Sequence, residues 1–190
     1  MDSVTDAVRR LIDTLESSGV EYAFGGAIAL AAWSEPRATA DVDIVLFVAD
    51  GEHDKAVDAV EAAGVVVDRR AALLEAAARG LFVGRIGRVR IDAFVPSIPY
   101  YDEARVRRVR TEIAGRPTWV HSAEALAVFK MLFFRPKDLI DIVRMLEVRG
   151  SDFDRTHVRS ALVEMLDEDE RISKWDELCA RVPAPTPIRS

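Results

Sequence analysis

Residues 37–48 read RATADVDIVLFV, a polar loop that runs into β-branched and apolar residues. The alternation over 41–48 predicts a strand. Because successive side chains of a strand point to opposite faces, Asp41 and Asp43 share one face, and Val42 and Ile44 share the other. Two carboxylates therefore point the same way.

A pair of glycines stands upstream of this strand. Residues 21–24 read as a short strand, Gly25 and Gly26 follow, and residues 27–33 read as a helix. At such a junction the absence of side chains lets backbone N–H groups and the helix N-terminus approach a phosphate. Taken alone, a Gly-Gly pair is more often a tight turn.

The clearest hairpin in the sequence runs over 81–95. Two alternating apolar runs flank Gly87-Arg88, a Gly-X pair that suits a two-residue type II′ turn. In the second run, Asp92 shares a face with Arg88 and Arg90, opposite the apolar residues. If this strand neighbours the aspartate-bearing strand, a third carboxylate joins the first two.

Three carboxylates on one face repel one another, and a bound cation relieves that repulsion. Carboxylate oxygens suit Mg²⁺ or Mn²⁺, which support phosphoryl and nucleotidyl transfer. The alternative is that Asp41 and Asp43 lie on the solvent face of an edge strand, because a lone D-x-D is short and common. The order of the motifs favours the metal site: Gly-Gly, a loop with Arg37 and Thr39, D-x-D, and then a later aspartate.

Composition limits the class of protein. With 49% hydrophobic and 31% charged residues, the 190-residue chain can bury a core, so disorder is excluded. The net charge of -6 argues against binding nucleic acid by bulk electrostatics. A local basic cluster is nevertheless formed by Arg105, Arg107, Arg108 and Arg110.

Cellular location and metal-binding motifs follow from a few residue types. The single cysteine, Cys179, excludes an internal disulfide and a cysteine-based zinc site, and it suits a reducing compartment. No window approaches the ~18 apolar residues of a membrane-spanning helix, so we expect a cytoplasmic protein with no membrane partner. His53, His121 and His157 show no metal-ligand spacing and are expected at the surface or at helix caps.

Strand and helix signals change along the chain. Helices are predicted over 4–15, ending near Gly19, and over 53–63 and 71–78. Beyond about residue 116 only helical patterns are read, over 123–134, 136–148, 154–167 and 172–182. The expected fold class is α+β: a core with a mixed sheet over 1–115, a C-terminal helical bundle over 116–182, and a flexible tail over 183–190.

The helical half carries its own candidates. Lys137 follows Pro136 in the first turn of a predicted helix, where a cation opposes the helix dipole. Such a placement is easier to understand if Lys137 binds an anion such as a nucleotide phosphate. On this helix the apolar residues are expected inside and the charged ones in solvent. The expected inner residues are Leu139, Ile140, Val143 and Leu146, and the expected outer ones are Lys137, Asp138, Asp141 and Arg144.

Lys130 is the only charge in the run 126–134. Its side chain either packs its methylene groups against the protein and places the ammonium group in solvent, or it reaches into the functional site. Asp138, Asp141 and Asp152 stay open as partners in function, and Asp152 could equally cap the next helix.

These motifs resemble the nucleotidyltransferase superfamily related to DNA polymerase β. The resemblance rests on GGA at 25–27, RATADVDI at 37–44 and VRID at 89–92. The continuation KMLFFRPKDLIDI over 130–142 is similar to the AbiEii/MenT group of nucleotidyltransferase toxins, so the likeness covers about residues 20–145.

The resemblance implies a role for each matching residue. Three aspartates would hold a catalytic Mg²⁺ or Mn²⁺, and Lys137 and Asp152 would join the catalytic set; the aspartates are Asp41, Asp43 and Asp92. Residues facing an NTP substrate would be Gly25, Gly26, Thr39, Lys130 and Arg135. Many superfamily members have Gly-Ser, so Gly26 replaces a serine here, and Thr39 either compensates for it or is a turn hydroxyl.

The resemblance also implies a function. The chain would transfer NMP, from a pyrimidine NTP, to the 3′ acceptor end of tRNA and so block translation, with a cognate antitoxin as partner. Phosphorylation of Thr39 by the antitoxin would set a dianion beside the carboxylates.

Two alternatives stay open. The first is a nucleotidyltransferase acting on a small molecule of the aminoglycoside type, whose site should be ringed by acid, whereas the arginines over 105–110 favour tRNA. The second is a catalytically silent binding module that keeps the fold.

Overall fold

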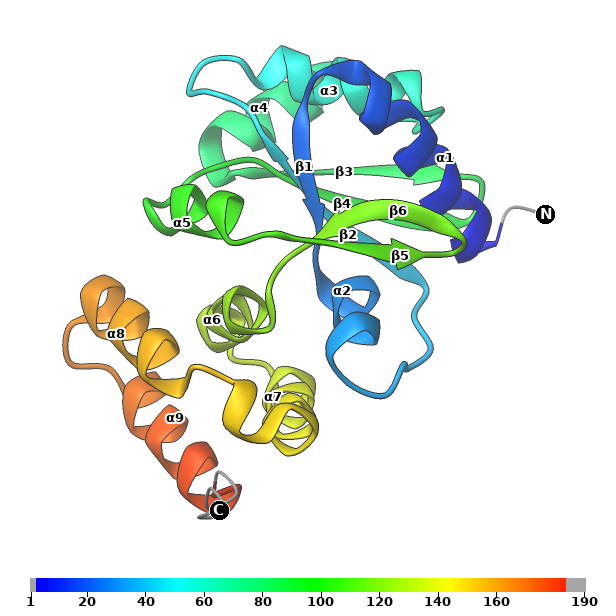
Figure 1. Ribbon diagram of the computed structural model, residues 1–190. Coiled ribbons are helices and arrows are strands. Elements are labelled where there is room, and N and C mark those ends of the chain that lie inside the picture. Colours follow the sequence, from blue (N-terminus) through cyan, green and yellow to red (C-terminus); the bar gives the residue numbers. More distant parts are fainter. Residues whose placement is uncertain (1–2, 184–190) are drawn as a thin grey trace. The chain divides into compact units, whose positions relative to one another are not determined.

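The computed structural model describes residues 3–183. Figure 1 shows their elements, which follow in the order α1 (Val4–Ser18), β1 (Glu21–Phe24), α2 (Gly26–Trp33), β2 (Asp41–Phe47), α3 (His53–Ala62), α4 (Arg69–Arg79), β3 (Leu81–Ile86), β4 (Val89–Phe94), α5 (Tyr100–Val106), β5 (Val109–Ile113), β6 (Arg116–Val120), α6 (Ala123–Phe133), α7 (Pro136–Arg149), the 3₁₀ helix η1 (Gly150–Asp152), α8 (Arg155–Leu166) and α9 (Glu170–Arg181). Residues 184–190 of the predicted tail lie outside the described residues. Over residues 3–183, no helix combines the length and the apolar character needed to cross a membrane.

The strands of the described chain form one six-stranded sheet in the order β3-β4-β2-β1-β6-β5. The pairs β2/β4 and β1/β6 are parallel, and the other three pairs are antiparallel. The mixed sheet predicted from the sequence is confirmed.

One face of the sheet buries the apolar side chains under helices. Val42, Ile44 and Leu46 of β2 and Ile91 of β4 are fully buried. Figure 1 shows α1, α3 and α4 together on one side of the sheet, where α4 contacts β3 and α1 contacts β2 and β6. The alternate residues of β2 and β4 lie on the opposite face, which we call the aspartate face because it carries Asp41, Asp43 and Asp92.

The first helix begins and ends as predicted. Ser3 and Asp6 form a reciprocal capping box at its N-terminus, and Gly19 ends it in the left-handed conformation with φ of 76°. Its buried residues recur at helical spacing, so α1 packs as an amphipathic helix.

The predicted hairpin over 81–95 is confirmed. β3 and β4 pair antiparallel from Leu81↔Phe94 to Ile86↔Val89. Gly87 has φ of 57° and Arg88 does not enter the left-handed region, which fits a type II′ turn.

The prediction that strands end near residue 116 is wrong, because β6 covers Arg116–Val120 and pairs with both β1 and β5. The predictions from the sequence include neither β5 and β6 nor the helix α5. β5 is a short edge strand in which Val109, Thr111 and Ile113 alternate with Arg110 and Glu112, a strand pattern that was passed over in the sequence. Ala114 and Gly115 both have positive φ and make the tight turn between β5 and β6.

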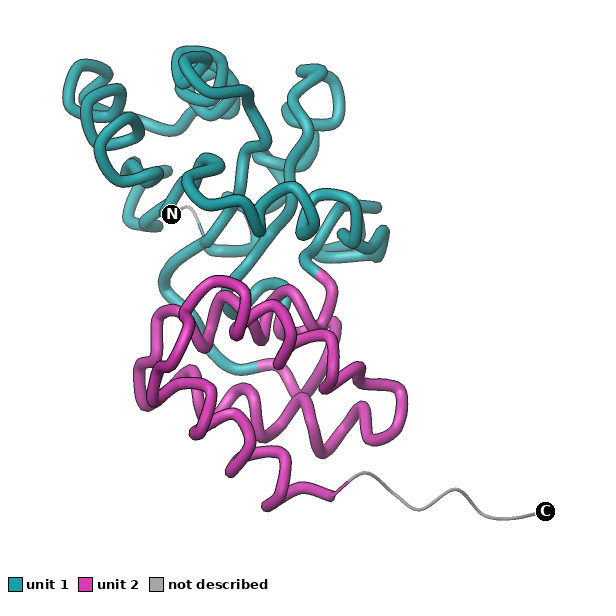
Figure 2. Tube along the Cα trace, turned by 90° about the vertical axis from the view of Figure 1, so that its left-hand side faces the viewer, with its two compact units in different colours: residues 1–29, 37–121 teal, residues 30–36, 122–190 magenta. Residues whose placement is uncertain are grey.

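The chain divides into two compact units, coloured separately in Figure 2. Unit 1 contains the chain up to Ala29 together with Arg37–His121, and therefore the whole sheet. Unit 2 contains Leu30–Pro36 and the chain from Ser122 onward.

Unit 2 is a helical bundle, as predicted for the C-terminal half. α6 contacts α7, α8 and α9, and α8 also packs against α9. Its core includes the fully buried side chains of Met131, Ile142, Leu162 and Trp175, one from each of these helices.

Candidate active site

The strand register brings the three predicted aspartates together. β2 and β4 are neighbouring parallel strands in which Asp43 pairs with Asp92 and Asp41 pairs with Arg90. Paired residues place their side chains on the same face, so all three carboxylates lie on the aspartate face of unit 1. The three residues are partly buried, and the Asp92 side chain is 17% exposed.

The glycine pair borders this cluster from the next strand. The Gly25 N–H donates to the backbone oxygen of Asp43 at 2.9 Å. Gly26 begins α2 with φ of 50°, and an ideal Cβ on it would lie 1.8 Å from Asp43 Oδ2. Only glycine fits at position 26 with Asp43 in this position, which gives a steric reason for the absence of the serine found in many superfamily members.

Arg90 is a member of the cluster to which the sequence analysis gave no role. Its Nε donates to Asp92 Oδ1 at 2.7 Å. This hydrogen bond raises the pKa of the Arg90 guanidinium, and the charges of Asp41 and Asp43 act in the same direction. Its place on the face of Asp92, two residues away in β4, was the signal that could have identified it.

The donor set fits a hard divalent cation, although the side chains do not converge on one point. Within residues 3–183, no three acidic, histidine or cysteine residues are grouped closely enough to hold a metal ion. Asp92 is turned toward Arg90, and an oxygen of Asp43 lies against Gly26. Three carboxylates on adjacent strands still offer the oxygen ligands that Mg²⁺ or Mn²⁺ prefers.

Thr39 lies two residues before the start of β2 and is hydrogen-bonded to its first residue. Its hydroxyl donates to the backbone oxygen of Asp41 at 3.0 Å and accepts from the Asp41 N–H at 3.3 Å. This geometry is that of a turn hydroxyl, the second of the two interpretations left open for Thr39.

His121 is not the surface or capping residue that we expected from the sequence. It is 2% exposed at the end of β6, its ring lies edge-on to Phe47 with centroids 6.4 Å apart, and burial lowers the pKa of its imidazole to about 3. Its Cδ2 lies 3.6 Å from the ideal Cβ position of Gly25. The neutral ring therefore packs beside the glycine pair.

In unit 2, Lys130 is buried in an ion cluster. Its Nζ donates to Asp141 Oδ2 at 2.7 Å and to Asp138 Oδ1 at 3.3 Å, and all three side chains are less than 5% exposed. Arg135, half exposed over the Phe133 ring, donates to Asp138 Oδ2 at 2.6 Å. Lys130 therefore does not extend to solvent, and its partners among the three open candidates are Asp138 and Asp141.

The predicted orientation of α7 is wrong for several residues. Asp138 and Asp141 are 1% exposed, whereas Ile140 is 55% exposed. The sequence rule that charges face solvent fails here because Lys130 of α6 neutralises the two carboxylates inside the bundle.

Lys137 and Asp152 are both exposed. Lys137 lies in the first turn of α7, directly after Pro136, as predicted. Asp152 lies in η1, and the cap of α8 is Asp154, which accepts from the His157 N–H at 2.9 Å. The catalytic roles of Lys137 and Asp152, and nucleotide binding by Lys130 and Arg135, stay predictions.

The arginine cluster over 105–110 is largely neutralised within unit 1. Arg105 and Arg108 both donate to Glu21, Arg107 to Glu103, and Arg110 to Glu16. Arg108 and Arg110 also lie over the Trp119 ring. The sequence argument that these arginines favour tRNA is weakened, because glutamates already satisfy them.

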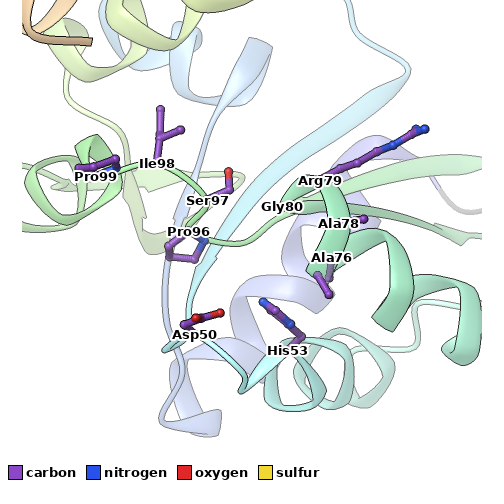
Figure 3. A pocket seen from close by; sticks show the side chains of 11 residues that line it. Asp50, His53, Ala76, Ala78, Arg79, Gly80, Pro96, Ser97, Ile98 and Pro99 are labelled. Atoms are coloured by element: carbon purple, nitrogen blue, oxygen red, sulfur yellow. The ribbon is translucent and has the colours of Figure 1, made fainter.

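A separate hollow of about 680 Å³ opens at the far ends of β2 and β4 from the aspartates. Figure 3 shows Asp50 and His53 pointing toward one another in it, beside Pro96. Asp50 lies three residues beyond the last residue of β2, whereas Asp41 and Asp43 lie in its first three residues. None of the predicted site residues lines this hollow.

Comparison with known proteins tests the resemblance. A family model described as "Nucleotidyl transferase AbiEii toxin, Type IV TA system" matches residues 10–189. No curated protein matches the chain.

Two solved structures share the fold. The solution structure of the antibiotic-resistance factor ANT(2″)-Ia has a TM-score of 0.52 and 16% identity, covering 95% of this chain and 84% of that one. The crystal structure of ANT(2″)-Ia in complex with adenylyl-2″-tobramycin has a TM-score of 0.52 and 15% identity, covering 94% of this chain and 98% of that one. Likeness at these identities shows the fold alone.

The family match and the fold agree with each other. The matched residues cover both compact units, and the mixed sheet with its helical bundle is the polymerase β-like nucleotidyltransferase fold predicted from the sequence. The chain belongs to the AbiEii nucleotidyltransferase toxin family of type IV toxin–antitoxin systems.

Proposed function

We propose that this nucleotidyltransferase transfers an NMP group, from a pyrimidine NTP, to the 3′ hydroxyl of tRNA in the presence of Mg²⁺ or Mn²⁺. The observation that carries the proposal is the register that sets Asp43 beside Asp92, next to Gly26, which places no side chain against the Asp43 carboxylate. Asp41, Asp43 and Asp92 would hold the cation, which supplies positive charge beside the reacting phosphate when bound.

Other steps of the proposed reaction, proton removal and triphosphate binding, are assigned to residues of unit 1. Asp92 accepts a hydrogen bond from the attacking hydroxyl and takes its proton as the oxygen attacks the α-phosphorus. The new bond forms to that phosphorus as the bond to the bridging oxygen breaks, and pyrophosphate leaves. Gly25 and Gly26, at the start of α2, present backbone rather than side chains to the triphosphate.

Arg90 has two alternative partners in this scheme. It neutralises Asp92 in the structure, with its side chain 44% exposed. When Asp92 turns to a cation, the same guanidinium is in place to pair with a phosphate oxygen.

Regulation by a partner follows from the family. A type IV toxin–antitoxin system supplies an antitoxin, and we propose the Thr39 hydroxyl as its phosphorylation target. A phosphate there would remove the proton that Thr39 donates to the Asp41 backbone oxygen and would set negative charge beside the carboxylates.

A small cationic acceptor is the second candidate. A structure that shares the fold holds adenylyl-2″-tobramycin, and the arginines over 105–110 are occupied by glutamates. This candidate predicts transfer to an aminoglycoside rather than to RNA.

The test uses each labelled NTP with Mg²⁺ and either total tRNA or tobramycin. We compare the wild-type chain with Asp41→Asn and Asp43→Asn, and with Asp50→Asn, an exposed aspartate near the other end of β2, as the matched control. Label on tRNA that is lost in the first two variants and kept in the third supports the proposal. Label on tobramycin alone overturns the RNA acceptor, and transfer that survives Asp41→Asn and Asp43→Asn overturns the assignment of the site.

A further inference from the structure

Arg85 stands on the aspartate face at the edge of the sheet. In the strand register, Arg85 of β3 lies opposite Arg90 of β4, and Arg90 lies opposite Asp41 of β2. Neighbouring strands lie ~4.8 Å apart, so the Cα atoms of Arg85 and Asp41 are roughly 10 Å apart. An extended arginine side chain covers much of that distance.

The backbone of Arg85 is fixed although its side chain is exposed. Its N–H donates to the Val66 oxygen at 3.0 Å, and its own oxygen accepts from the Val66 N–H at 2.8 Å. This bridge lies on the outer side of β3 and reinforces the edge of the sheet at that residue. The backbone position from which the Arg85 side chain extends is therefore fixed by these two hydrogen bonds.

Arg88 extends the same edge. It lies exposed in the turn between β3 and β4, two residues before Arg90. Within the described chain, residues 3–183, neither Arg85 nor Arg88 has a carboxylate partner, whereas Arg90 pairs with Asp92.

This edge differs from the arginine cluster over 105–110. There, Glu16, Glu21 and Glu103 neutralise the guanidinium groups. In a chain of net charge -6, two exposed arginines without an acidic partner, beside a carboxylate site, are positioned to bind an anion.

We propose that Arg85 and Arg88 form a phosphate-binding strip for the sugar–phosphate backbone of an RNA acceptor, close to its reacting hydroxyl. The strip deepens the proposed function and rests on it. Guanidinium groups match phosphate oxygens in geometry and charge, and such contacts position a strand without reading its sequence. A polycationic acceptor would be repelled at the same place.

The test measures binding of fluorescein-labelled tRNA to the full chain by anisotropy, without NTP, between about 50 and 200 mM salt. The double variant Arg85→Ala/Arg88→Ala is compared with Arg70→Ala. Arg70 is a matched control, because it is exposed on α4 and has no carboxylate partner among the described residues. We expect the double variant to bind several-fold more weakly and the slope of log affinity against log salt to fall by roughly 1 to 2, with no change for Arg70→Ala.

Nucleotide binding and transfer are measured in parallel, so that the two proposals fail separately. If the wild type transfers NMP to tRNA and the double variant binds tRNA equally well, the strip is wrong and the proposed function stands. If the double variant loses tRNA binding but the wild type shows no nucleotide transfer, the strip is supported and the proposed function is overturned. If the wild type binds no tRNA and labels tobramycin, the strip and the RNA acceptor are both overturned.

Discussion

Gly26 leaves no room for a side chain beside Asp43. Its φ is 50°, and an added Cβ would meet Asp43 Oδ2 at 1.8 Å. Alanine at this position must push the carboxylate aside, and it also carries backbone strain of ~1–2 kcal/mol. Because displacement of a reacting group by about 1 Å can cost on the order of 100-fold in rate, we expect Gly26→Ala to lower nucleotide transfer by about that factor.

Gly51→Ala separates the steric effect from the strain. Gly51 has φ of 78°, and nothing lies within 4 Å of its ideal Cβ. Circular dichroism should show a loss of thermal stability in both variants, at least as large in Gly26→Ala, and only Gly26→Ala should lose transfer activity. Equal activity losses in the two variants would contradict the steric argument.

At the scale of elements, Glu21 of β1 ties this strand to the segment of α5 and β5. Its carboxylate accepts from Arg105 Nη1 at 2.6 Å and also from Arg108. The hydrogen bond from Arg105, with help from Arg108, lowers the pKa of Glu21. A carboxyl group with a depressed folded pKa stabilises the protein above its unfolded pKa, and this stabilisation is lost as the pH falls through the folded value.

Glu21→Gln should therefore lower the unfolding free energy at pH 7, and this loss should shrink as the pH falls below the unfolded pKa of Glu21. The loss should not exceed about 1 kcal/mol, because Glu21 is 43% exposed and solvent screens the pair. Thermal unfolding at pH 7 and near pH 3 provides the measurement. Glu112→Gln is the control, since Glu112 is exposed on β5 and has no ion pair among the described residues; a pH-independent loss in Glu21→Gln would show that the charge is irrelevant.

The elements that could be predicted from sequence are those whose pattern reflects burial on one face. Residues 41–44 of β2 and 89–93 of β4 alternate between polar and apolar side chains, so the shared face of Asp41, Asp43 and Asp92 follows from a period of two. β5 has the same alternation, with Val109, Thr111 and Ile113 on one face, but it is only five residues long, and β6 begins with two exposed residues and has no such pattern. Their pairing depends on contacts distant in the sequence.

The same limit applies to the ion cluster of α6 and α7. Each charged residue alone is expected in solvent, and only the contact between Lys130 and Asp141 reverses that expectation. Arg90 was missed for a related reason. An arginine two residues from an aspartate is ordinary in a sequence, and only the register of β2 and β4 places it among three carboxylates.

Lys130→Met tests the buried cluster. Removing the lysine leaves Asp138 and Asp141 at 1% exposure without their shared cation, so we expect a loss of about 3–5 kcal/mol in unfolding free energy. Urea denaturation followed by circular dichroism measures it. Lys174→Met removes a lysine paired with the exposed Glu177 and should cost less than about 1 kcal/mol; equal losses would mean that burial does not matter here.

At the scale of the whole molecule, neither compact unit is a continuous stretch of chain. Residues 30–36 belong to the helical unit although they lie between segments of the sheet unit. No composition change marks this excursion, so the sequence predicts a single boundary near residue 116. The assignment depends on contacts such as that of Arg149, whose guanidinium carbon lies 5.6 Å from the centre of the Trp33 ring.

Trp33→Ala tests whether this excursion stabilises the helical unit. Loss of the ring removes a cation–π contact of ~0.5–2 kcal/mol and part of the apolar surface beside α7. We expect amide hydrogen exchange in α7 to accelerate by roughly threefold to thirtyfold, because 1.4 kcal/mol corresponds to a factor of ten. Exchange in the sheet strands β2 and β4 should stay as in the wild type, because they belong to unit 1. Acceleration in the strands with none in α7 would contradict the assignment of residues 30–36 to the helical unit.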